Sequence, residues 1–474
     1  MTGELPPGWS RTSLARLGVW GSGGTPSRQD PEAFGEGIPW LKIGDLSDGP
    51  VRAFEESITA KGLANSSAKL LEPGTLLVAM YGSIGKLGIT TFRCATNQAI
   101  AFCKLHEGID LRYVFYALLN ERQRLLDLGQ GGTQLNISQT LLRAHEVNLA
   151  PAREQQRIVS RIEELFSEID EGERALERVG RLVERYRQSV LKAAVTGELT
   201  RGWRGSVLVD VGAPVVAEDG PLPAGWKWQS LDELSWATSY GTSAKCAAEK
   251  AGLPVLRIPN VRGGRIDLLD LKWAPADLEL ATDDLLAPGD LLVVRTNGSD
   301  SLIGVGAVVL EPLPEPSYFA SYLIRFRLKP EPHLAEWINL VWQSDVVRRF
   351  VHEHKATSAG QYNISQSKLR GLRLPIPPEP ERKHLLDAWQ TVSSRVAATL
   401  RDVVAGRQGA TALRQSILKA AFSGQLVPQD PRDEPASALL ARLAAQASDA
   451  PVTPRRRGRP AGRRSSQPNP SVTP

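Results

Sequence analysis

The clearest pattern in the chain is a regular apolar seam in the segment 151–199. Apolar residues recur at alternating steps of four and three, with charged residues at most positions between them. A seam with a period of 3.5 residues predicts a long α-helix that supercoils against a second helix. Pro151 suits an early helical position and Gly197 a C-cap, which gives a helix on the order of 60–70 Å long. The seam positions are Ile158, Ile162, Leu165, Ile169, Gly172, Leu176, Val179, Val183, Tyr186 and Val190.

The chain contains this segment twice. QLNISQTLLR at 134–143 matches QYNISQSKLR at 361–370, and RQSVLKAAVTGEL at 187–199 matches RQSILKAAFSGQL at 414–426, without a gap between them. This internal duplication predicts two long helices packed antiparallel about a pseudo-twofold axis. Gly406 and Gly409 lower the helix propensity at the centre of the second copy. The second seam comprises Leu385, Trp389, Val392, Val396, Thr399, Val403, Gly406, Ala410, Leu413 and Ile417.

The regions before the two helices resemble each other loosely. LPPGW opens the first and LPAGW the second, and both continue with short β-branched or leucine-rich runs punctuated by Pro-Gly or Gly, which predict strands and turns. A helical stretch follows in each, at 110–126 and 334–351. The predicted fold class is α+β, with two small mixed α/β domains separated by two long antiparallel coiled-coil helices. The predicted segments are a first domain at 1–150, a first helix at 151–200, a linker at 201–221, a second domain at 222–377, a second helix at 378–426, a turn and short helix at 427–449, and a disordered basic tail at 450–474.

Composition narrows the function classes. The chain has 474 residues, of which 42% are hydrophobic, and we find no apolar run long enough for a membrane span and no secretory leader. Three cysteines without a CxxC pair favour a reducing cytoplasm. The net charge is +5, and six arginines in the tail leave +5 minus 6, or −1, for the preceding body. A near-neutral body does not bind nucleic acid by bulk charge, so any binding depends on local faces or on a basic partner.

No catalytic constellation emerges from the sequence. GSIGKLG at 82–88 lacks the spacing of a phosphate loop, and the chain has no HExxH, GxSxG or dinucleotide-binding fingerprint. His352 and His354 lack a ligand cluster and are predicted to be surface residues at a helix end. The sequence therefore predicts a non-enzyme with no catalytic residue, no metal site and no cofactor bound by this chain.

The repeated QLNISQ and QYNISQ segments allow two interpretations. Asn and Gln pair bidentately with adenine, so Gln134, Asn136, Gln361 and Asn363 could reach bases. Alternatively, the Asn or Ser residues cap the short helix that follows. Residues that discriminate different sequences should differ between the copies, so the structural interpretation is favoured.

A glycine-rich loop after a predicted strand, unlike the NIS segment, differs between the two copies. MYGSIGK at 80–86 corresponds to RTNGSDS at 295–301, and the polar residues differ. Such side chains can contact bases or phosphates, although an ordinary surface hairpin explains the loop equally well. Two further cations, Lys42 and Arg257, occupy matching strand positions and could face a ligand or solvent. The candidate DNA-binding residues are Lys42, Tyr81, Ser83, Lys86, Arg257, Arg295, Asn297 and Ser299.

The arginine-rich tail also carries a candidate motif. Its Arg-Gly-Arg-Pro core resembles an AT-hook, which lies in a narrow minor groove. A solubilising or nonspecifically phosphate-binding tail is favoured over that interpretation.

Taken in order, these motifs resemble the specificity (S) subunits of Type I restriction–modification systems. The resemblance rests on GGTPSR at 23–28 followed by IPWLKIGDL, on QLNISQ before a proline and a Glu-Gln pair (Glu154, Gln155), and on RQSVLKAAVTGELT with Trp203 and Arg204 after it. SGQLVPQDPRDEPASALLARL at 423–443 completes it, so the resemblance covers residues 5–446. The second domain departs from it at TSAKC (242–246) and at HKATSAG (354–360).

The resemblance implies a non-catalytic, cytoplasmic subunit with two target recognition domains, each reading one half of a bipartite site in double-stranded DNA. The long helices would set the gap and dock two methyltransferase (M) subunits, which bring S-adenosylmethionine, while restriction (R) subunits add chemistry that uses ATP and Mg²⁺. The alternatives are a coiled-coil scaffold that binds proteins and a stand-alone nuclease or methyltransferase. The candidate docking residues, from the matched RQSxLKAA segments, are Arg187, Gln188, Lys192, Arg414, Gln415 and Lys419.

Overall fold

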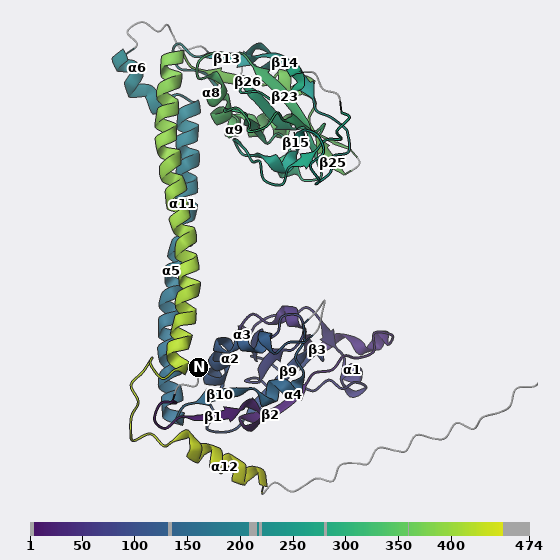
Figure 1. Ribbon diagram of the computed structural model, residues 1–474, viewed down its shortest axis with the longest axis vertical. Helices are drawn as coiled ribbons and strands as arrows, with labels where there is room; N and C mark the ends of the chain where they lie inside the picture. Colours follow the sequence, from purple (N-terminus) through teal and green to yellow (C-terminus); the bar gives the residue numbers. More distant parts are fainter. Residues whose placement is uncertain are drawn as a thin grey trace, which may run out of the picture. The chain divides into compact units, whose positions relative to one another are not determined.

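The computed structural model describes residues 4–130, 135–207, 216–217, 220–278, 282–358 and 360–448. It divides into two compact units, and each is described by itself. Unit 1 comprises residues 1–173 and 408–474, and unit 2 comprises residues 174–407. Each unit holds one β-rich domain and a stretch of both long helices (Figure 1). Within the described residues, no helix is long and apolar enough to cross a membrane.

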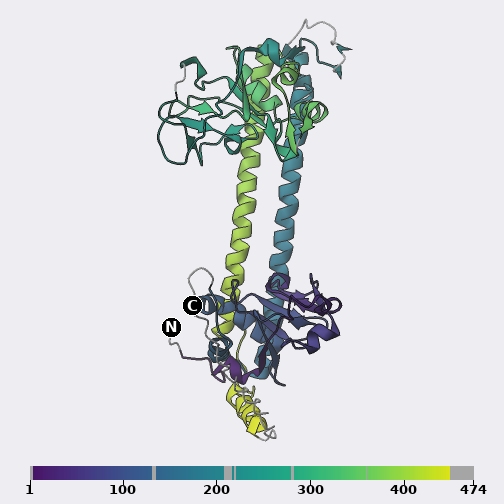
Figure 2. The same cartoon turned by 90° about the vertical axis from the view of Figure 1, so that its right-hand side faces the viewer.

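The two long helices predicted from the seam are present. α5 (Ala152–Val195) and α11 (Glu379–Phe422) have 44 residues each, which corresponds to about 66 Å at the helical rise. They lie side by side in Figures 1 and 2. Each is followed by a glycine in the left-handed region, Gly197 at φ +70° and Gly424 at φ +73°, which favours glycine at a helix end. The prediction of Gly197 as the terminating residue is confirmed.

The helices are antiparallel where they pack within unit 2. Leu176 lies against Gly406, and four residues further along α5, a Cβ added at Gly180 would lie 3.9 Å from Val403. Higher numbers in α5 therefore meet lower numbers in α11. A Cβ added at Gly406 would come within 2.9 Å of the Leu176 side chain, so the missing side chain lets the helices approach closely. The glycine that lowers helix propensity thus contributes to packing.

The predicted seam holds at Leu176 and Val183, which are half-buried, but is wrong at Val179 and Tyr186. Val179 and Tyr186 are 39% and 56% exposed, whereas Gly180 and Arg187, one residue later, are half-buried. Likewise Leu413 in α11 is 51% exposed while its neighbour Arg414 is half-buried. A straight helix has 3.6 residues per turn and drifts about 20° per heptad from a 3.5-residue repeat, so at some positions the residue after the predicted one faces the contact.

The β-rich domain of unit 1 is built on a five-stranded sheet with strand order β2-β9-β6-β7-β4. Its main core joins the sheet to α2 and to residues of α5, α11 and α12 (Ala436–Ser448). Flanking it are the pair β1-β10 and the small sheet β5-β3-β8. The elements are β1 (Ser10–Ser13), β2 (Gly18–Ser22), β3 (Phe34–Leu41), β4 (Gly49–Val51), β5 (Ser57–Ile58), α1 (Ala60–Ala64), β6 (Leu76–Ala79), β7 (Leu87–Thr90), β8 (Ala95–Thr96), β9 (Ile100–Leu105), α2 (Leu111–Asn120), α3 (Arg122–Asp127), α4 (Gln139–Ala144) and β10 (Glu146–Leu149).

Unit 2 repeats this topology with a four-stranded sheet of order β14-β23-β19-β21, which corresponds to β2-β9-β6-β7. The pair β13-β26 corresponds to β1-β10, and β18-β15-β22 to the small sheet. The elements are α6 (Arg201–Val207), β11 (Val216–Ala217), β12 (Gly220–Pro221), β13 (Lys227–Ser230), α7 (Leu231–Leu234), β14 (Ser235–Tyr240), β15 (Pro254–Leu256), β16 (Val261–Arg262), β17 (Arg265–Ile266), β18 (Lys272–Trp273), β19 (Asp290–Val294), β20 (Thr296–Asn297), β21 (Gly306–Val308), β22 (Tyr318–Phe319), β23 (Leu323–Leu328), α8 (Leu334–Val341), α9 (Asp345–His354), β24 (Ala356–Ser358), β25 (Gln361–Asn363), α10 (Gln366–Arg370) and β26 (Arg373–Ile376).

The single helices predicted at 110–126 and 334–351 are each two helices. The first breaks at Glu121, whose carboxylate pairs with Arg124 at 2.9 Å and lies 3.4 Å from His145. The second breaks at Ser344, whose hydroxyl donates to the Val341 carbonyl at 2.6 Å. In each case a side-chain interaction stabilises the turn between the helices, and apolar periodicity alone could not show it.

The start of the predicted linker is also ordered. Residues 198–207 form a 3-10 turn, η4 (Glu198–Thr200), and α6. Thr200 and Arg204 bind the carboxylate of Glu381, which is fully buried; the Thr200 Oγ1 bond is 2.6 Å long, and Trp226 Nε1 donates to the same carboxylate at 2.9 Å. The buried acid therefore ties the end of α5 and the LPAGW segment to the start of α11.

The equivalent acid in unit 1 has a different environment. Glu154 is 1% exposed, and among the described residues no cation lies within ion-pair distance of it. Burial raises the pKa of Glu154, against the opposing effects of the Trp9 side chain and of Arg157, which pairs with Asp433 at 2.6 Å. The two acids are equivalent in sequence, but within the part of the chain that the structure describes only Glu381 has an arginine partner.

The recurrence of LPxGW and of the glycine after each long helix has one structural reason. A Cβ on Gly197 would clash with Pro223 and approach Trp226 to 3.1 Å, and a Cβ on Gly424 would clash with Pro6. In each unit the LPxGW segment thus packs on a helix end that only glycine leaves open. These motifs are structural.

Candidate nucleic-acid interface

In each unit the structure brings the glycine-rich loop and the NIS segment together. In unit 1, Tyr81 forms a β-bridge with Asn136. In unit 2, Thr296 pairs with Asn363 between β20 and β25. The loop and the NIS segment of a unit, which are about 55 to 65 residues apart in the chain, therefore form one composite surface. We call it the loop–NIS surface, and it comprises 80–86 with 135–138 in unit 1 and 295–301 with 361–365 in unit 2.

The structural interpretation of the NIS segment, in which Asn or Ser caps the following helix, is confirmed for the serine. Ser138 caps α4 by accepting from the Leu141 amide at 3.2 Å, and Ser365 caps α10 by accepting from the Lys368 amide at 3.3 Å. The isoleucine of each segment is 1% exposed and belongs to the core. Asn136 and Gln361 are exposed and Asn363 is half-buried, whereas Gln134 lies outside the described residues.

The candidate residues of the unit 1 loop have unequal exposure. Tyr81 is 41% exposed and Ser83 is exposed. Lys86 is half-buried and donates to the Ile43 carbonyl at 3.2 Å, which holds the loop against the domain. Tyr81 and Ser83 are therefore accessible to a ligand, and Lys86 also has a structural contact.

In unit 2 the loop carries a cation on an aromatic ring. The guanidinium of Arg295 lies 4.6 Å from the centroid of the Tyr240 ring. Asn297 accepts from the Ser299 amide at 2.7 Å, which orders the turn, and Ser299 bonds Ser301 at 2.9 Å. A nearby cation is neutralised, because Lys355 pairs with Asp300 and so lowers the pKa of that carboxyl. Within the described residues, Arg295 has neither an acidic partner nor a side-chain hydrogen bond.

The prediction that Lys42 and Arg257 occupy strands is wrong. Each is the N-cap of a 3-10 turn just after a strand, η3 (Ile43–Asp45) and η5 (Ile258–Asn260), because the third residue of the turn accepts from its amide. Lys42 pairs with Glu55 and Glu56 at 2.8 and 2.9 Å, which raises its pKa to about 12. Arg257 pairs with Asp270 at 3.1 Å. A phosphate would have to displace these carboxylates.

The two docking arginines make contacts within their own units. Arg414 pairs with Asp170 and with Glu173 at 2.7 Å, and these ion pairs raise its pKa. Arg187 lies 5.9 Å from the Trp389 ring centroid and donates to Gln343 at 3.3 Å. Both arginines therefore stabilise the packing of the long helices. The other four docking candidates, Gln188, Lys192, Gln415 and Lys419, are exposed.

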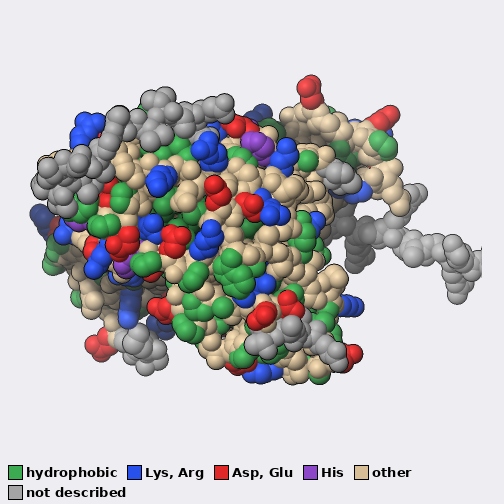
Figure 3. Space-filling model, turned by 90° about the horizontal axis from the view of Figure 1, so that it is seen from above, with side chains coloured by type: hydrophobic (Ala, Val, Ile, Leu, Met, Phe, Trp, Pro, Cys, Tyr) green, Lys and Arg blue, Asp and Glu red, His purple; other side chains and the backbone are tan. Residues whose placement is uncertain are grey.

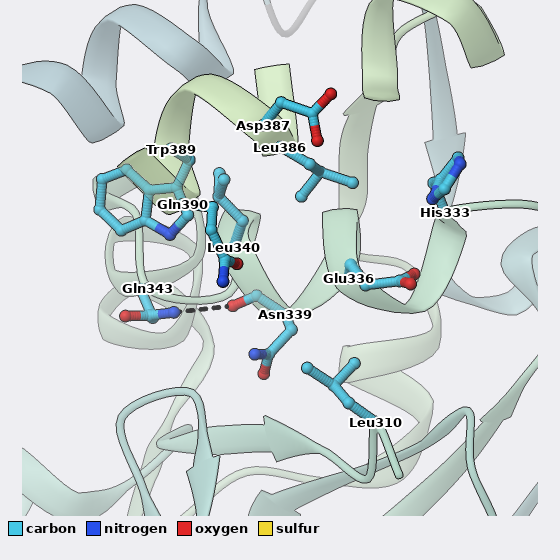
Figure 4. A pocket seen from close by; sticks show the side chains of 10 residues that line it. All are labelled: Leu310, His333, Glu336, Asn339, Leu340, Gln343, Leu386, Asp387, Trp389 and Gln390. Carbon is cyan, nitrogen blue, oxygen red and sulfur yellow. Dashed lines mark hydrogen bonds between the residues drawn. The ribbon is translucent and has the colours of Figure 1, made fainter. Parts of the chain in front are cut away.

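A hollow of about 320 Å³ lies beside this contact in unit 2, between α8 and the first turns of α11 (Figure 4). Leu386, Trp389 and Gln390 line it from α11, and Asn339 and Gln343 from the other side, where the Gln343 amide donates to the Asn339 carbonyl at 3.1 Å. The lining is mixed and holds no nucleophile–base pair. In the described part of the chain, no group of three or more His, Cys, Asp or Glu residues could hold a metal ion.

Charge is dispersed on one face of the molecule. On the face seen in Figure 3, basic and acidic side chains are interspersed and form no large basic patch. His352 and His354 lie in the last turn of α9, as predicted, and His354 stacks on Phe350.

Sequence reasoning missed Tyr240 and Tyr322, which are 42% and 56% exposed beside the unit 2 loop. The Arg295 amide donates to the Tyr322 carbonyl at 2.9 Å. Tyr240, at the end of β14, carries no signal in the sequence by itself. Aligning the two units strand by strand would have revealed that Tyr240 lies where unit 1 has Ser22.

Comparisons with known proteins identify what this arrangement resembles. The family model described as "Type I restriction modification DNA specificity domain" matches residues 6–178. The Type I restriction enzyme EcoKI specificity subunit of Escherichia coli (strain K12) is 24% identical over 467 residues, covering 94% of this chain and 96% of its own length. The StySPI specificity subunit of Salmonella potsdam is 22% identical over 462 residues, with the same coverages of 94% and 96%.

Solved structures share the fold. A chain from a study of "complex assembly and conformational transition of the type I R-M system" aligns with a TM-score of 0.66 at 17% identity, covering 89% of this chain and 100% of that chain. The HsdS subunit from Thermoanaerobacter tengcongensis aligns with a TM-score of 0.50 at 17% identity, covering 90% and 99%. The predicted α+β class, with two β-rich domains and two long helices packed together, is confirmed.

Proposed function

Because the chain belongs to the specificity subunits of Type I restriction–modification systems, we propose that its two loop–NIS surfaces read the two halves of a bipartite target in double-stranded DNA. Such a subunit is the DNA-recognition component of a restriction enzyme complex and is itself non-catalytic. The domains at 1–150 and 222–377 are the two target recognition domains in this proposal, and α5 and α11 set the gap between the half-sites.

One observation carries the proposal: the two surfaces share a backbone frame and differ in side chains. The Ile137 amide donates to the Met80 carbonyl at 2.9 Å, and the Ile364 amide donates to the Arg295 carbonyl at 2.8 Å. A constant backbone frame with variable side chains suits two domains that recognise different DNA sequences. Contacts to bases determine the sequence that is recognised, and the frame only positions the side chains that make them. A protein-binding scaffold gives no reason for this combination.

The partners are proposed from the family. Two methyltransferase subunits would bring S-adenosylmethionine, and restriction subunits would add ATP- and Mg²⁺-dependent chemistry, in the cytoplasm where DNA is accessible. Docking falls to the exposed members of the RQSxLKAA segments, Gln188, Lys192, Gln415 and Lys419. The near-neutral body leaves non-specific phosphate affinity largely to these partners. In this proposal the Arg-rich tail adds at most phosphate contacts that are independent of DNA sequence. The tail lies outside the described residues.

A domain exchange tests the proposal. Residues 222–377 are replaced by the corresponding region of a relative, and the chain is expressed with a methyltransferase subunit of its own system. Sequencing of methylated DNA should show a bipartite motif in which one half changes and the other stays. A change in both halves, or methylation without any motif, would contradict two independent readers. Methylation by the chain alone would instead favour a stand-alone methyltransferase.

A further inference from the structure

The internal duplication provides a residue-by-residue comparison at the loop–NIS surface. Arg295 and Met80 occupy the same backbone position, because each amide donates to the residue before β23 or β9 and each carbonyl accepts from the NIS isoleucine. The loops end at equivalent glycines, Gly85 at φ +73° and Gly304 at φ +72°, whose amides donate to the Ala79 and Val294 carbonyls. The frame is thus shared, although the unit 2 loop is longer.

Strand registers extend the comparison to the neighbours of Arg295. Tyr240 pairs with Ile324 in β23, and Ser22 pairs with Ala101 at the same level of β9. The Tyr322 carbonyl accepts from Arg295 as the Ala99 carbonyl accepts from Met80. Unit 2 therefore has Tyr240, Arg295 and Tyr322 where unit 1 has Ser22, Met80 and Ala99.

These three differences act together. Met80 is 4% exposed and lies in the core of unit 1, so the position needs no charge for folding. In unit 2 the arginine is half-buried, its guanidinium carbon lies over the Tyr240 ring, and Tyr322 beside it is 56% exposed. A guanidinium held over an aromatic ring has fewer accessible rotamers, so less side-chain entropy is lost when it binds a ligand.

The donors of this arginine are unused. Unlike Lys42, Arg257 and Lys355, which face carboxylates, Arg295 has no acidic partner and no side-chain hydrogen bond within the described residues. Five N–H groups in a planar fork are therefore available to an acceptor pair. Guanine presents such a pair, O6 and N7, at its major-groove edge, and arginine is its commonest partner.

We propose that Arg295, positioned by Tyr240, reads a guanine in the half-site of the second domain. The inference rests on the proposed function and goes beyond it by naming the residue and the base. Unit 1 lacks the pair, so its half-site is read by other side chains, and Tyr81, 41% exposed on the same loop, is available there.

The test uses the complete complex and the residues that the other unit carries. Arg295→Met and Tyr240→Ser place the unit 1 residues in unit 2, and Arg265→Met removes an exposed cation from β17, outside the loop–NIS surface. Each variant is expressed with its methyltransferase subunit, and the methylated motif is read by sequencing. Thermal unfolding of each purified complex checks folding.

For Arg295→Met we expect one guanine of the second half-site to become degenerate, with discrimination against other bases falling about tenfold to a hundredfold. Tyr240→Ser should weaken the same position, Tyr240→Phe should preserve it, and Arg265→Met should leave the motif unchanged. The domain exchange shows which half-site belongs to unit 2.

Three outcomes would overturn the proposal. An unchanged motif with uniformly weaker methylation would indicate a phosphate contact, and an unchanged motif at full methylation would indicate that Arg295 does not contact DNA. Loss of base discrimination in the half-site of unit 1 would show that Arg295 does not read the half-site of the second domain. A wild-type complex without any sequence preference would refute the proposed function itself, and this result is distinct from the other three.

Discussion

The two buried acids at the starts of the long helices should respond differently to the same substitution. Glu381 accepts from Thr200 and Trp226 and pairs with Arg204, which is 14% exposed. Glu381→Gln keeps the shape and removes the charge, so Arg204 is left without its counter-charge. Glu154→Gln removes a buried charge that has no ion-pair partner among the described residues.

The magnitudes follow from these environments. Removing one partner of a buried ion pair costs about 3–5 kcal/mol, because the other charge is left uncompensated. For unit 2, with residues 174–407, about 3 kcal/mol corresponds to a fall in Tm of roughly 6–12 °C. Neutralising Glu154 relieves a desolvation penalty, so unit 1 should be unchanged or slightly more stable.

Hydrogen exchange followed by mass spectrometry separates the units within the full chain. In Glu381→Gln, amides of α6 and of the segment around Trp226 should lose protection, while those around Trp9 should not. In Glu154→Gln, neither region should lose protection. Equal loss in both variants, or no loss in Glu381→Gln, would refute the claim that only Glu381 has a stabilising ionic network.

Three further predictions follow from the same contacts. Burial raises the folded-state pKa of Glu154 above its unfolded value, so the stability of unit 1 should fall as pH rises from the unfolded pKa through the folded one. A pH series of unit 1 stability should show this decline, and Glu154→Gln should abolish it. Arg414→Glu should destabilise the helix pair of the free chain by about 1–2 kcal/mol through loss of its two carboxylate contacts, as thermal unfolding would show; loss of methyltransferase binding at unchanged stability would instead support a docking role. Deleting 174–180 together with 401–407 should shorten the paired helices by about 10 Å and the methylated gap by about three base pairs; an unchanged gap would show that the helices do not set it.

The sequence by itself determined the architecture. The duplicated seam predicted α5 and α11, and Gly197 predicted where the first one ends, because apolar periodicity and glycine at a helix end act locally along the chain. The strand-rich character of both domains and the family resemblance also followed from motif order. The exact residues that face the partner helix did not follow from the sequence. Val179 and Tyr186 were predicted in the seam, and Gly180 and Arg187 lie there instead. Helix twist accumulates over many turns, and a heptad count ignores the drift.

Only the tertiary structure decided which candidate side chains are available to a ligand. Lys42, Arg257 and Arg295 are equal as cations in the sequence, but folding places carboxylates beside the first two and a tyrosine ring beside the third. The partners of Arg295 come from β14 and from the turn before β23, far along the chain. Availability depends on which distant groups meet across a sheet, and that pairing is set by strand register and packing, which single-residue patterns do not encode.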